Sequence, residues 1–277
     1  MELKRFGSIL LATFKRFEKN DGWAHSSHIA LSLLIAIFPF CIFSLSLAVQ
    51  LSSDVSQSDL MEFVFGTWPD LLSEPIEREI STVFETSGTA ELTVGSILAI
   101  FFASNGVDAI RTSITAAYNE TDQRPFWKTR LLCVVFVISG ALVLSAAGAL
   151  TIAFPAYFEF AATSSPDLQA HWFSSGPLRD TIALALLLLF LVSCHLWLPV
   201  HRRPLSSVMP GVLLTIVLWA ICAQGFSFYI KHFGSYSVTY AGLAGIMATL
   251  IFMYFMSAIF IYGAELNGQL AEEVVEP

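Results

Sequence analysis

Six long apolar segments alternate with polar connections along the chain. A helix needs about 20 mostly apolar residues to cross the hydrocarbon core of a bilayer. The pattern therefore predicts an all-α polytopic membrane protein with a single integral-membrane domain, residues 1–277. Pro39 interrupts the first segment, and neighbouring helices must satisfy the backbone carbonyl that it frees. The six predicted transmembrane helices lie at about 29–51, 92–112, 132–155, 180–200, 208–230 and 242–266.

The second apolar segment carries a polar stripe, which we call the seam. Its members recur at spacings of three and four residues, so a helix would place them on one face. They are Asn105, Asp108, Thr112, Thr115 and Asn119. Arg111 follows Asp108 by one turn and lies close to the same face. Because charged groups are costly in lipid, we expect the seam to face other helices or water.

Residues 1–22 are predicted to form an amphipathic helix before the first span. Leu10, Phe14 and Phe17 lie on its apolar side, and Arg16 and Lys19 lie on the opposite, basic side. A basic amphipathic helix beside a span favours an interfacial position on the anionic inner leaflet. The alternative is an ordinary cytoplasmic helix packed on the bundle.

The connection 52–91 is long and acidic, with Arg78 as its one basic residue. Its apolar residues recur at helical spacing, which predicts a helical periplasmic cap; the alternative is a solvated acidic loop. Residues 156–179 contain Ser, Gly and Pro clusters typical of a surface loop. Small residues at every fourth position, as in Ala141, Ser145 and Ala149, predict close packing of the third span, and a similar run predicts it for the sixth.

Composition supports a membrane protein, because 55% of the residues are hydrophobic and only 13% are charged. Most of the 14 Lys and Arg residues fall in the N-terminal segment and in the second-to-third and fourth-to-fifth connections. By the positive-inside rule, both termini then lie in the cytoplasm. The net charge of −8 does not suggest a nucleic-acid partner. The four cysteines lie in apolar runs, and their spacing indicates neither a disulfide framework nor a metal site.

No enzyme motif, cofactor motif or metal-ligand cluster occurs in the sequence, so we expect neither catalysis nor a cofactor. Polar residues nevertheless gather at the predicted cytoplasmic half of the bundle. Besides the seam they are His25, Ser26 and His28 before the first span, His195 in the fourth, and Glu265 and Asn267 at the end of the sixth. Two interpretations remain open: a satisfied network that locks the helices together, or a polar cavity open to the cytoplasm. We further expect Asp108, Arg111 and Glu265 to form one charge-balanced group.

Three stretches resemble the YihY/BrkB family of bacterial inner-membrane proteins, which has also carried the name ribonuclease BN. They are "HSSHIALSLLIAIFPF", "NGVDAIRTSITAAYNETDQRPFWKTRLL" and "YAGLAGIMATLIFMYFMSAIFIYGAELNGQL", the last being the most specific. His28 and Ser32 depart from the family's usual small and aromatic residues. The resemblance implies six spans, cytoplasmic termini and a multi-pass inner-membrane location. Links of related proteins to envelope lipid traffic and serum resistance favour a transport role.

The first function expected is therefore a transporter or flippase-like protein for an amphipathic or anionic envelope molecule. The second is a non-transporting membrane scaffold of envelope biogenesis. A ribonuclease is a distant third, because such an enzyme needs a metal-binding cluster. The expected partners are anionic inner-leaflet lipid and an amphipathic substrate. A homo-oligomer is compatible with the sequence, which does not decide the oligomeric state.

Overall fold

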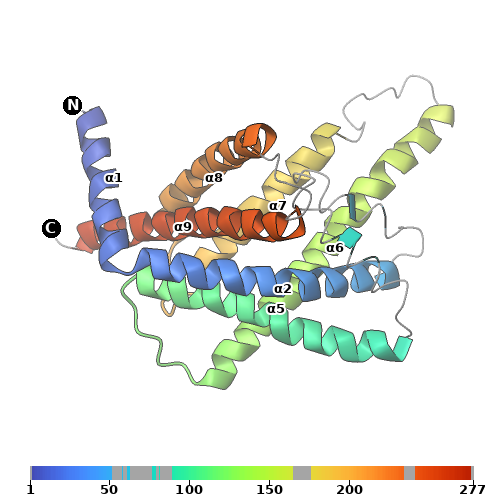
Figure 1. Cartoon of the computed structure of the whole chain (residues 1–277), viewed down its shortest axis with the longest axis horizontal. Coiled ribbons are helices and arrows are strands. Elements are labelled where there is room, and N and C mark those ends of the chain that lie inside the picture. Colours follow the sequence, from blue (N-terminus) through green and yellow to red (C-terminus); the bar gives the residue numbers. More distant parts are fainter. Residues whose placement is uncertain are drawn as a thin grey trace. The chain divides into compact units, whose positions relative to one another are not determined.

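Helices are the only regular secondary structure in the part of the chain that the computed structural model describes, residues 2–51, 58, 61–62, 77–78, 81, 89–164, 176–233 and 241–275. Each predicted apolar segment falls on one helix. The helices are α1 (Glu2–Lys19), α2 (Gly22–Leu51), α5 (Thr89–Ala117), α6 (Phe126–Ser164), α7 (Gly176–Trp197), α8 (Leu205–Phe233) and α9 (Ala241–Val275) (Figure 1). The prediction of an all-α protein is confirmed for these residues.

Within the described residues, three helical segments are long and apolar enough to cross a bilayer: Phe126–Ala147, Leu205–Tyr229 and Met247–Glu272. Gly22–Ile37 and Thr181–Trp197 are shorter apolar helical segments. The chain is therefore a helical membrane protein, whereas six spans with two cytoplasmic termini stay a prediction. Most of the predicted periplasmic cap, including its apolar positions, lies outside the described residues. The loop predicted at 156–179 begins later than expected, because α6 continues to Ser164.

The chain divides into two compact units, and each is considered by itself. The first contains residues 1–36, 104–133 and 191–277, and the second contains 37–103 and 134–190. The second unit holds most of α6 and the helical residue Pro39. The first unit holds α1, α8, α9 and the connections around residues 118–125 and 198–204. All the polar contacts described below belong to the first unit.

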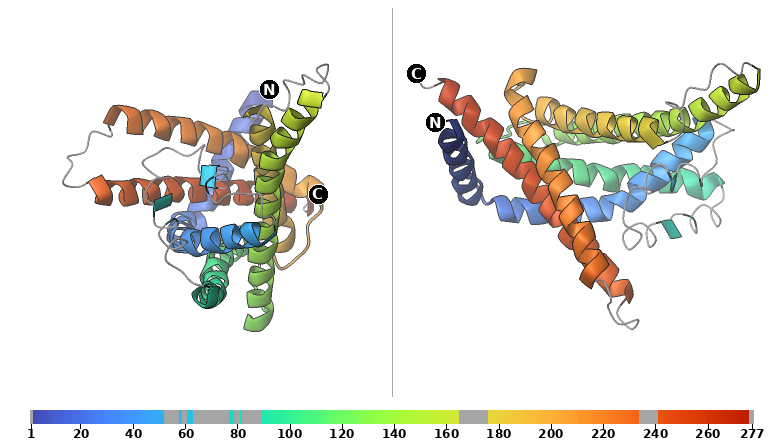
Figure 2. Two further views of the ribbon diagram at one scale, coloured as in Figure 1. Left: turned by 90° about the vertical axis from the view of Figure 1, so that its right-hand side faces the viewer. Right: turned by 90° about the horizontal axis from the view of Figure 1, so that it is seen from above.

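A sharp turn separates α1 from α2. Asp21 has a left-handed backbone with φ of 53°, and its carbonyl accepts the amide of His25. The ring of Phe17 lies over Gly22, where an added Cβ would come within 2.4 Å of ring carbons. Glycine therefore lets the chain turn under the aromatic ring. After this turn α1 stands steeply against α9 (Figures 1 and 2).

Helix α1 packs on α9 through part of the side that the sequence pattern predicted to be apolar. Thr13 and Phe17 are buried, and Thr13 donates to Gln269 Oε1 at 2.8 Å. Tyr262 of α9 donates to the carbonyl of Leu10 at 2.8 Å. Part of the apolar side of α1 therefore packs on the protein, as in the alternative of a helix packed on the bundle, and the interfacial position stays a prediction.

A very close helix contact in the first unit joins α8 to α9 through two glycines. A Cβ on Gly211 would lie 2.0 Å from the carbonyl oxygen of Gly263, and a Cβ on Gly263 would lie 2.1 Å from Thr215 Oγ1. Only residues without a side chain allow the two backbones to approach this far. The contact fixes the part of α9 that follows Gly263, where the polar residues begin.

Candidate functional site: a polar network around the connection 118–125

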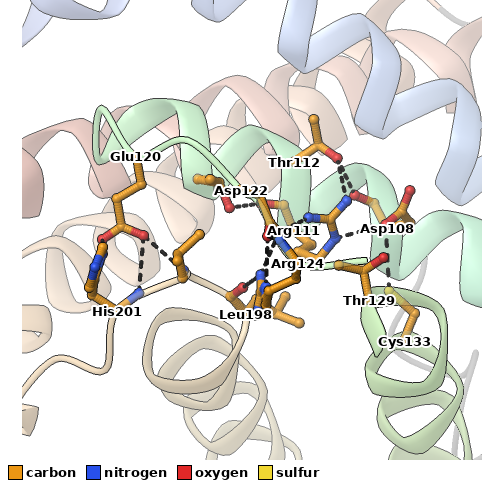
Figure 3. A network of polar contacts seen from close by, with 12 residues as sticks. Asp108, Arg111, Thr112, Glu120, Asp122, Arg124, Thr129, Cys133, Leu198 and His201 are labelled. Carbon is orange, nitrogen blue, oxygen red and sulfur yellow. Dashed lines mark hydrogen bonds and ion pairs between the residues drawn. The ribbon is translucent and has the colours of Figure 1, made fainter. Parts of the chain in front are cut away.

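The connection between α5 and α6 is the centre of an extensive polar network. α5 ends at Ala117, and Asn119 takes a left-handed backbone with φ of 52°, which asparagine tolerates better than most residues. The amide of Glu120 then bonds back to the carbonyl of Thr115 at 3.0 Å. After this turn, the side chain of Glu120 points to His201, and that of Asp122 points to Arg111 and Arg124 (Figure 3).

Glu265 is the most deeply buried carboxylate of the network, and its partner is Arg16. Arg16 Nε lies 2.7 Å from Glu265 Oε2, and Glu265 is inaccessible to solvent. Asn20 Nδ2 donates to both Glu265 oxygens, at 2.9 and 3.2 Å. Arg16 of α1 and Asn20, the residue that follows α1, thus donate to this carboxylate. The predicted pairing of Glu265 with Arg111 is wrong, because Arg111 has other acidic partners.

Arg16 also ties α1 to the end of α5. Its guanidinium pairs with Glu272 and donates to the carbonyl of Ala117 at 3.2 Å. A cation is favourable beside the last carbonyls of a helix, where the helix dipole is negative. Asn119 closes the arrangement by donating to Glu272 Oε1 at 3.1 Å. Gly268 leaves room for the Arg16 side chain, because a Cβ at position 268 would lie 2.9 Å from the Arg16 guanidinium.

Arg111 forms a second cluster with two carboxylates. Its Nε lies 2.8 Å from Asp108 Oδ1, as the spacing of three residues predicted, and its Nη1 pairs with Asp122 (Figure 3). Arg124 binds the same Asp122 carboxylate through its backbone amide at 2.9 Å and its guanidinium at 2.7 and 2.8 Å. These hydrogen bonds from Arg124 hold the pKa of Asp122 below its ordinary value. Arg124 further donates to the carbonyl of Leu198 at 3.0 Å, linking two connections.

Glu120 reaches the connection between α7 and α8. Its carboxylate accepts the backbone amides of Val200 and His201 and pairs with Arg203 Nη2 at 3.0 Å. The Arg203 guanidinium lies 3.9 Å from the ring centroid of Tyr118, a cation–π contact. The connection 118–125 is therefore bound to α9 through Asn119 and to the α7–α8 connection through Glu120.

A buried chain of hydrogen bonds lies beside the ion pairs. Tyr118 Oη is 2.8 Å from His195 Nδ1, and both side chains are buried. Asn267 receives the amide of Gly211 at 2.7 Å and donates to the carbonyl of Val208 at 2.9 Å. Pro210 lies between those positions in α8 and cannot donate a backbone bond. The Asn267 side chain thus binds the backbone of α8 on both sides of the proline.

The seam does not keep one environment along its length. Asn105 is exposed and accepts a hydrogen bond from Arg130 Nη1 at 2.6 Å. The Asp108 side chain is 40% exposed, whereas that of Arg111 is 12% exposed. Thr112 and Thr115 donate to carbonyls one turn earlier in their own helix. The seam therefore runs from an exposed part near Asn105 into the paired network at Asn119.

The residues predicted before the first span are not brought together as a site. His25 Nδ1 lies 3.4 Å from Ser113 Oγ, and buried Ser26 donates to the carbonyl of Gly22 at 2.6 Å. His28 is exposed, and Pro39 belongs to the second unit. Among the described residues, no group of three His, Cys, Asp or Glu side chains could hold a metal ion.

Sequence reasoning assigned no role to several residues that carry the network. They are Asn20, Tyr118, Glu120, Asp122 and Arg203, together with Arg16, which the sequence pattern assigned to the basic side of the helix. A usable signal was present in the density of charge in "YNETDQRP", since such a cluster between two apolar helices needs partners.

Apolar helices long enough to span a bilayer, held at one end by a polar network, define an integral membrane protein. The family model described as "Virulence factor BrkB" matches residues 13–276, so the chain belongs to this family. The chain is 29% identical to YfkH of Bacillus subtilis, whose name describes it only as ribonuclease-like, over 95% of both chains. It is 27% identical to a UPF0761 membrane protein of Cronobacter sakazakii, covering 93% of this chain and 86% of that one. A UPF0761 membrane protein of Aggregatibacter aphrophilus is 23% identical, with 98% and 94% covered. No solved structure matches the chain.

Proposed function

We propose that this protein moves an amphipathic, anionic envelope molecule across the inner membrane, as a transporter or a flippase-like protein. The observation that carries the proposal is the exposed part of the seam. Asn105 is exposed and Asp108 is partly exposed on a helix whose neighbouring residues Phe101 and Phe102 are apolar and exposed as well. A carboxylate at such a position needs water, a polar ligand or another protein surface beside it.

The depth of these residues supports the same proposal. At 1.5 Å per residue, Asn105 and Asp108 lie about 18 and 14 Å along α5 from its end at Ala117. The hydrocarbon core is about 30 Å thick, so the predicted span 92–112 would place both positions inside it. Exposing a charged group at the bilayer centre costs about 2.5–3.5 kcal/mol on insertion scales. A path for a polar headgroup explains why the helix retains the exposed polar side chains.

In this proposal the paired network is the closed cytoplasmic end of the path. Arg16, Arg111 and Arg203 each bridge to a carboxylate on another helix or connection. When the helices or connections separate, the charged groups of an ion pair can bind water or another charged group instead. Apolar side chains have no such alternative partner in water. The orientation with both termini in the cytoplasm and the location in the bacterial inner membrane belong to the proposal.

The transport proposal is tested with the purified full-length chain in vesicles that contain a fluorescent anionic lipid. A membrane-impermeant quencher in the external solution reports how much of the lipid moves to the outer leaflet. We expect the wild-type chain to accelerate this movement, Asp108→Asn to remain folded but slow it, and Ser27→Ala to behave as wild type. Ser27 is the control because it is exposed and donates to the carbonyl of Trp23 in its own helix. Equal rates in vesicles with and without the protein would contradict transport of the lipid.

A non-transporting scaffold is the second candidate, and the buried end of the network favours it. Glu265 receives donors from Arg16 and Asn20, and Asp122 receives them from Arg111 and Arg124. Such mutual pairing is what structural locking of helices requires. In the same vesicles, a scaffold would leave lipid movement unchanged, while Glu265→Gln would lower the melting temperature and any cellular phenotype would follow that loss.

A further inference from the structure

The turn between α7 and α8 presents several hydrogen-bond donors to one point. The backbone amides of Val200 and His201 both point to Glu120 Oε2, at 2.8 and 3.3 Å. Arg203 Nη2 donates to Oε1 at 3.0 Å. Successive backbone amides that converge in this way, with a guanidinium beside them, form the kind of concavity that binds anions in proteins. We call the donors of residues 200–203 the cradle.

The anion that occupies the cradle comes from elsewhere in the chain. Glu120 belongs to the connection between α5 and α6, and its side chain is almost fully buried by the contact (Figure 3). His201 Nδ1 lies 3.5 Å from Glu120 Oε1, yet the His201 side chain is 79% exposed. Arg202 is exposed as well. The cradle therefore borders solvent through basic residues.

The donors of the cradle exceed what the Glu120 carboxylate uses. Arg203 Nε is buried and has no hydrogen-bond partner among the described residues. The guanidinium cannot easily turn away, because it stacks on Tyr118. A phosphate group offers more oxygen acceptors than a carboxylate and can accept from a guanidinium through two parallel bonds. The unused donor thus matches an anion with more acceptor oxygens than Glu120 has.

We infer that residues 200–203 form an anion-binding site in which Glu120 is the resident anion, and that a phosphate group takes the same donors when Glu120 withdraws. Two kinds of ligand carry such a phosphate group: a phospholipid through its headgroup, and a free phosphate compound. Withdrawal of Glu120 would detach the α5–α6 connection from the α7–α8 connection at this point. The inference holds whether or not the protein transports its ligand.

The test uses the detergent-solubilised full chain with Glu120→Ala, which empties the cradle of its carboxylate. Thermal unfolding is followed by tryptophan fluorescence in sodium phosphate and in sodium chloride of equal ionic strength and pH. We expect phosphate to raise the melting temperature of Glu120→Ala by about 3 °C or more, the scale on which a new set of charged hydrogen bonds acts. The wild-type chain, with Glu120 in place, should respond much less.

Two further variants separate a built site from a general salt effect. Glu18→Ala removes an exposed carboxylate that has no side-chain donor in the described part of the chain, so it should not gain a phosphate response. Glu120→Ala combined with Arg203→Gln should lose the response. If Glu120→Ala does not fold, Glu120→Gln serves instead, because it keeps the shape and one acceptor oxygen while removing the charge. Equal responses of the Glu120 and Glu18 variants would overturn the inference.

The source of the phosphate is separated in the same assay. In one arm, inorganic phosphate is added to phosphate-free detergent; in another, short-chain phosphatidylglycerol micelles are added to phosphate-free buffer. Phosphatidylcholine micelles are the third arm, because their phosphate is neutralised by choline. A response to phosphatidylglycerol beyond that to phosphatidylcholine assigns the site to an anionic headgroup, and a response to inorganic phosphate alone assigns it to a soluble anion. The absence of a response in every arm would contradict the anion site.

Discussion

Arg16 and Glu265, which are far apart in the sequence, form an ion pair with 2.7 Å between Arg16 Nε and Glu265 Oε2. Glu265 is fully buried, and Arg16 is largely buried. Removing one partner of such a pair leaves a buried charge without compensation, which typically costs about 3–5 kcal/mol. The pair therefore makes the docking of α1 on α9 a condition for the stability of the first unit.

A double-mutant cycle on Arg16→Gln and Glu265→Gln should show strong coupling. Each single variant should lower the melting temperature of the detergent-solubilised chain, and the double variant should lower it by less than the sum. The matched cycle replaces Arg16→Gln by Arg111→Gln, whose ion pairs are with Asp108 and Asp122. We expect near-additive effects in that cycle, because residues without a shared partner usually act independently. Coupling of Arg111 but not Arg16 to Glu265 would contradict the observed pairing.

Gly211→Ala or Gly263→Ala should disrupt the crossing of α8 and α9. A methyl on Gly211 would lie 2.0 Å from the carbonyl oxygen of Gly263, and a methyl on Gly263 would lie 2.1 Å from Thr215 Oγ1. The two helices must therefore separate to admit either methyl. Gly225→Ala is the control in α8, because nothing lies within 4 Å of the Cβ that it would add. Melting temperature and monodispersity on size-exclusion chromatography should fall for the first two variants and be kept or improved for the third. A loss as large for Gly225→Ala would contradict the role of close packing at Gly211 and Gly263, because helix propensity alone favours alanine over glycine.

The stability of the chain should depend on the charge of Asp122 at acidic pH. Hydrogen bonds from Arg124 place the pKa of Asp122 below its ordinary value of 3.8, with a further contribution from the Arg111 charge. Because the folded pKa is the lower one, this contribution is fully present above the unfolded pKa and is lost as pH falls through the folded pKa. Asp122→Asn should therefore flatten the dependence of the melting temperature on pH between about pH 5 and the folded pKa. Identical slopes for the two chains would contradict the role of the Arg124 bonds.

The exposed face of α1 is expected to lie at the membrane surface. Leu11 and Phe14 are exposed on one flank of α1, and Lys15 and Lys19 are exposed on the other. Lysines near an anionic leaflet gain about 1 kcal/mol each, and salt screens this attraction. In vesicles, a fluorophore at position 14 should be quenched by a lipid-borne quencher and one at position 15 by an aqueous quencher. The same response at both positions would place α1 away from the interface.

The parts of the fold that depend on local pattern could be predicted from the sequence. The apolar segments fell on helices, and the spacing of Asp108 and Arg111 correctly indicated an ion pair within α5. The partner of Glu265 could not be obtained in this way, because depth and charge favour Arg111 as well as Arg16. Choosing between them requires the turn at Asp21, which sets α1 against α9.

The contributions of loops and close contacts were missed for different reasons. Glu120 and Asp122 lie in an irregular connection, where no periodicity shows which way a side chain points. The small-residue runs directed attention to other turns of α6 and α9, whereas the close approach in the first unit joins Gly211 to Gly263. A glycine contact between two helices depends on where the helices cross. The sequence of either helix taken alone does not carry that information.

The accessibility of position 105 to water tests the central claim most directly, because transport requires the exposed part of the seam to face a polar path. Asn105→Cys and Leu213→Cys are made in a chain whose native cysteines are replaced by alanine, reconstituted in vesicles and treated from either side with a membrane-impermeant maleimide. Leu213, exposed on apolar α8, is the lipid-facing control. The account predicts that Asn105→Cys reacts, that anionic lipid slows the reaction, and that Leu213→Cys stays unmodified. An Asn105→Cys thiol as unreactive as that of Leu213→Cys, from both sides and without anionic lipid, would contradict it.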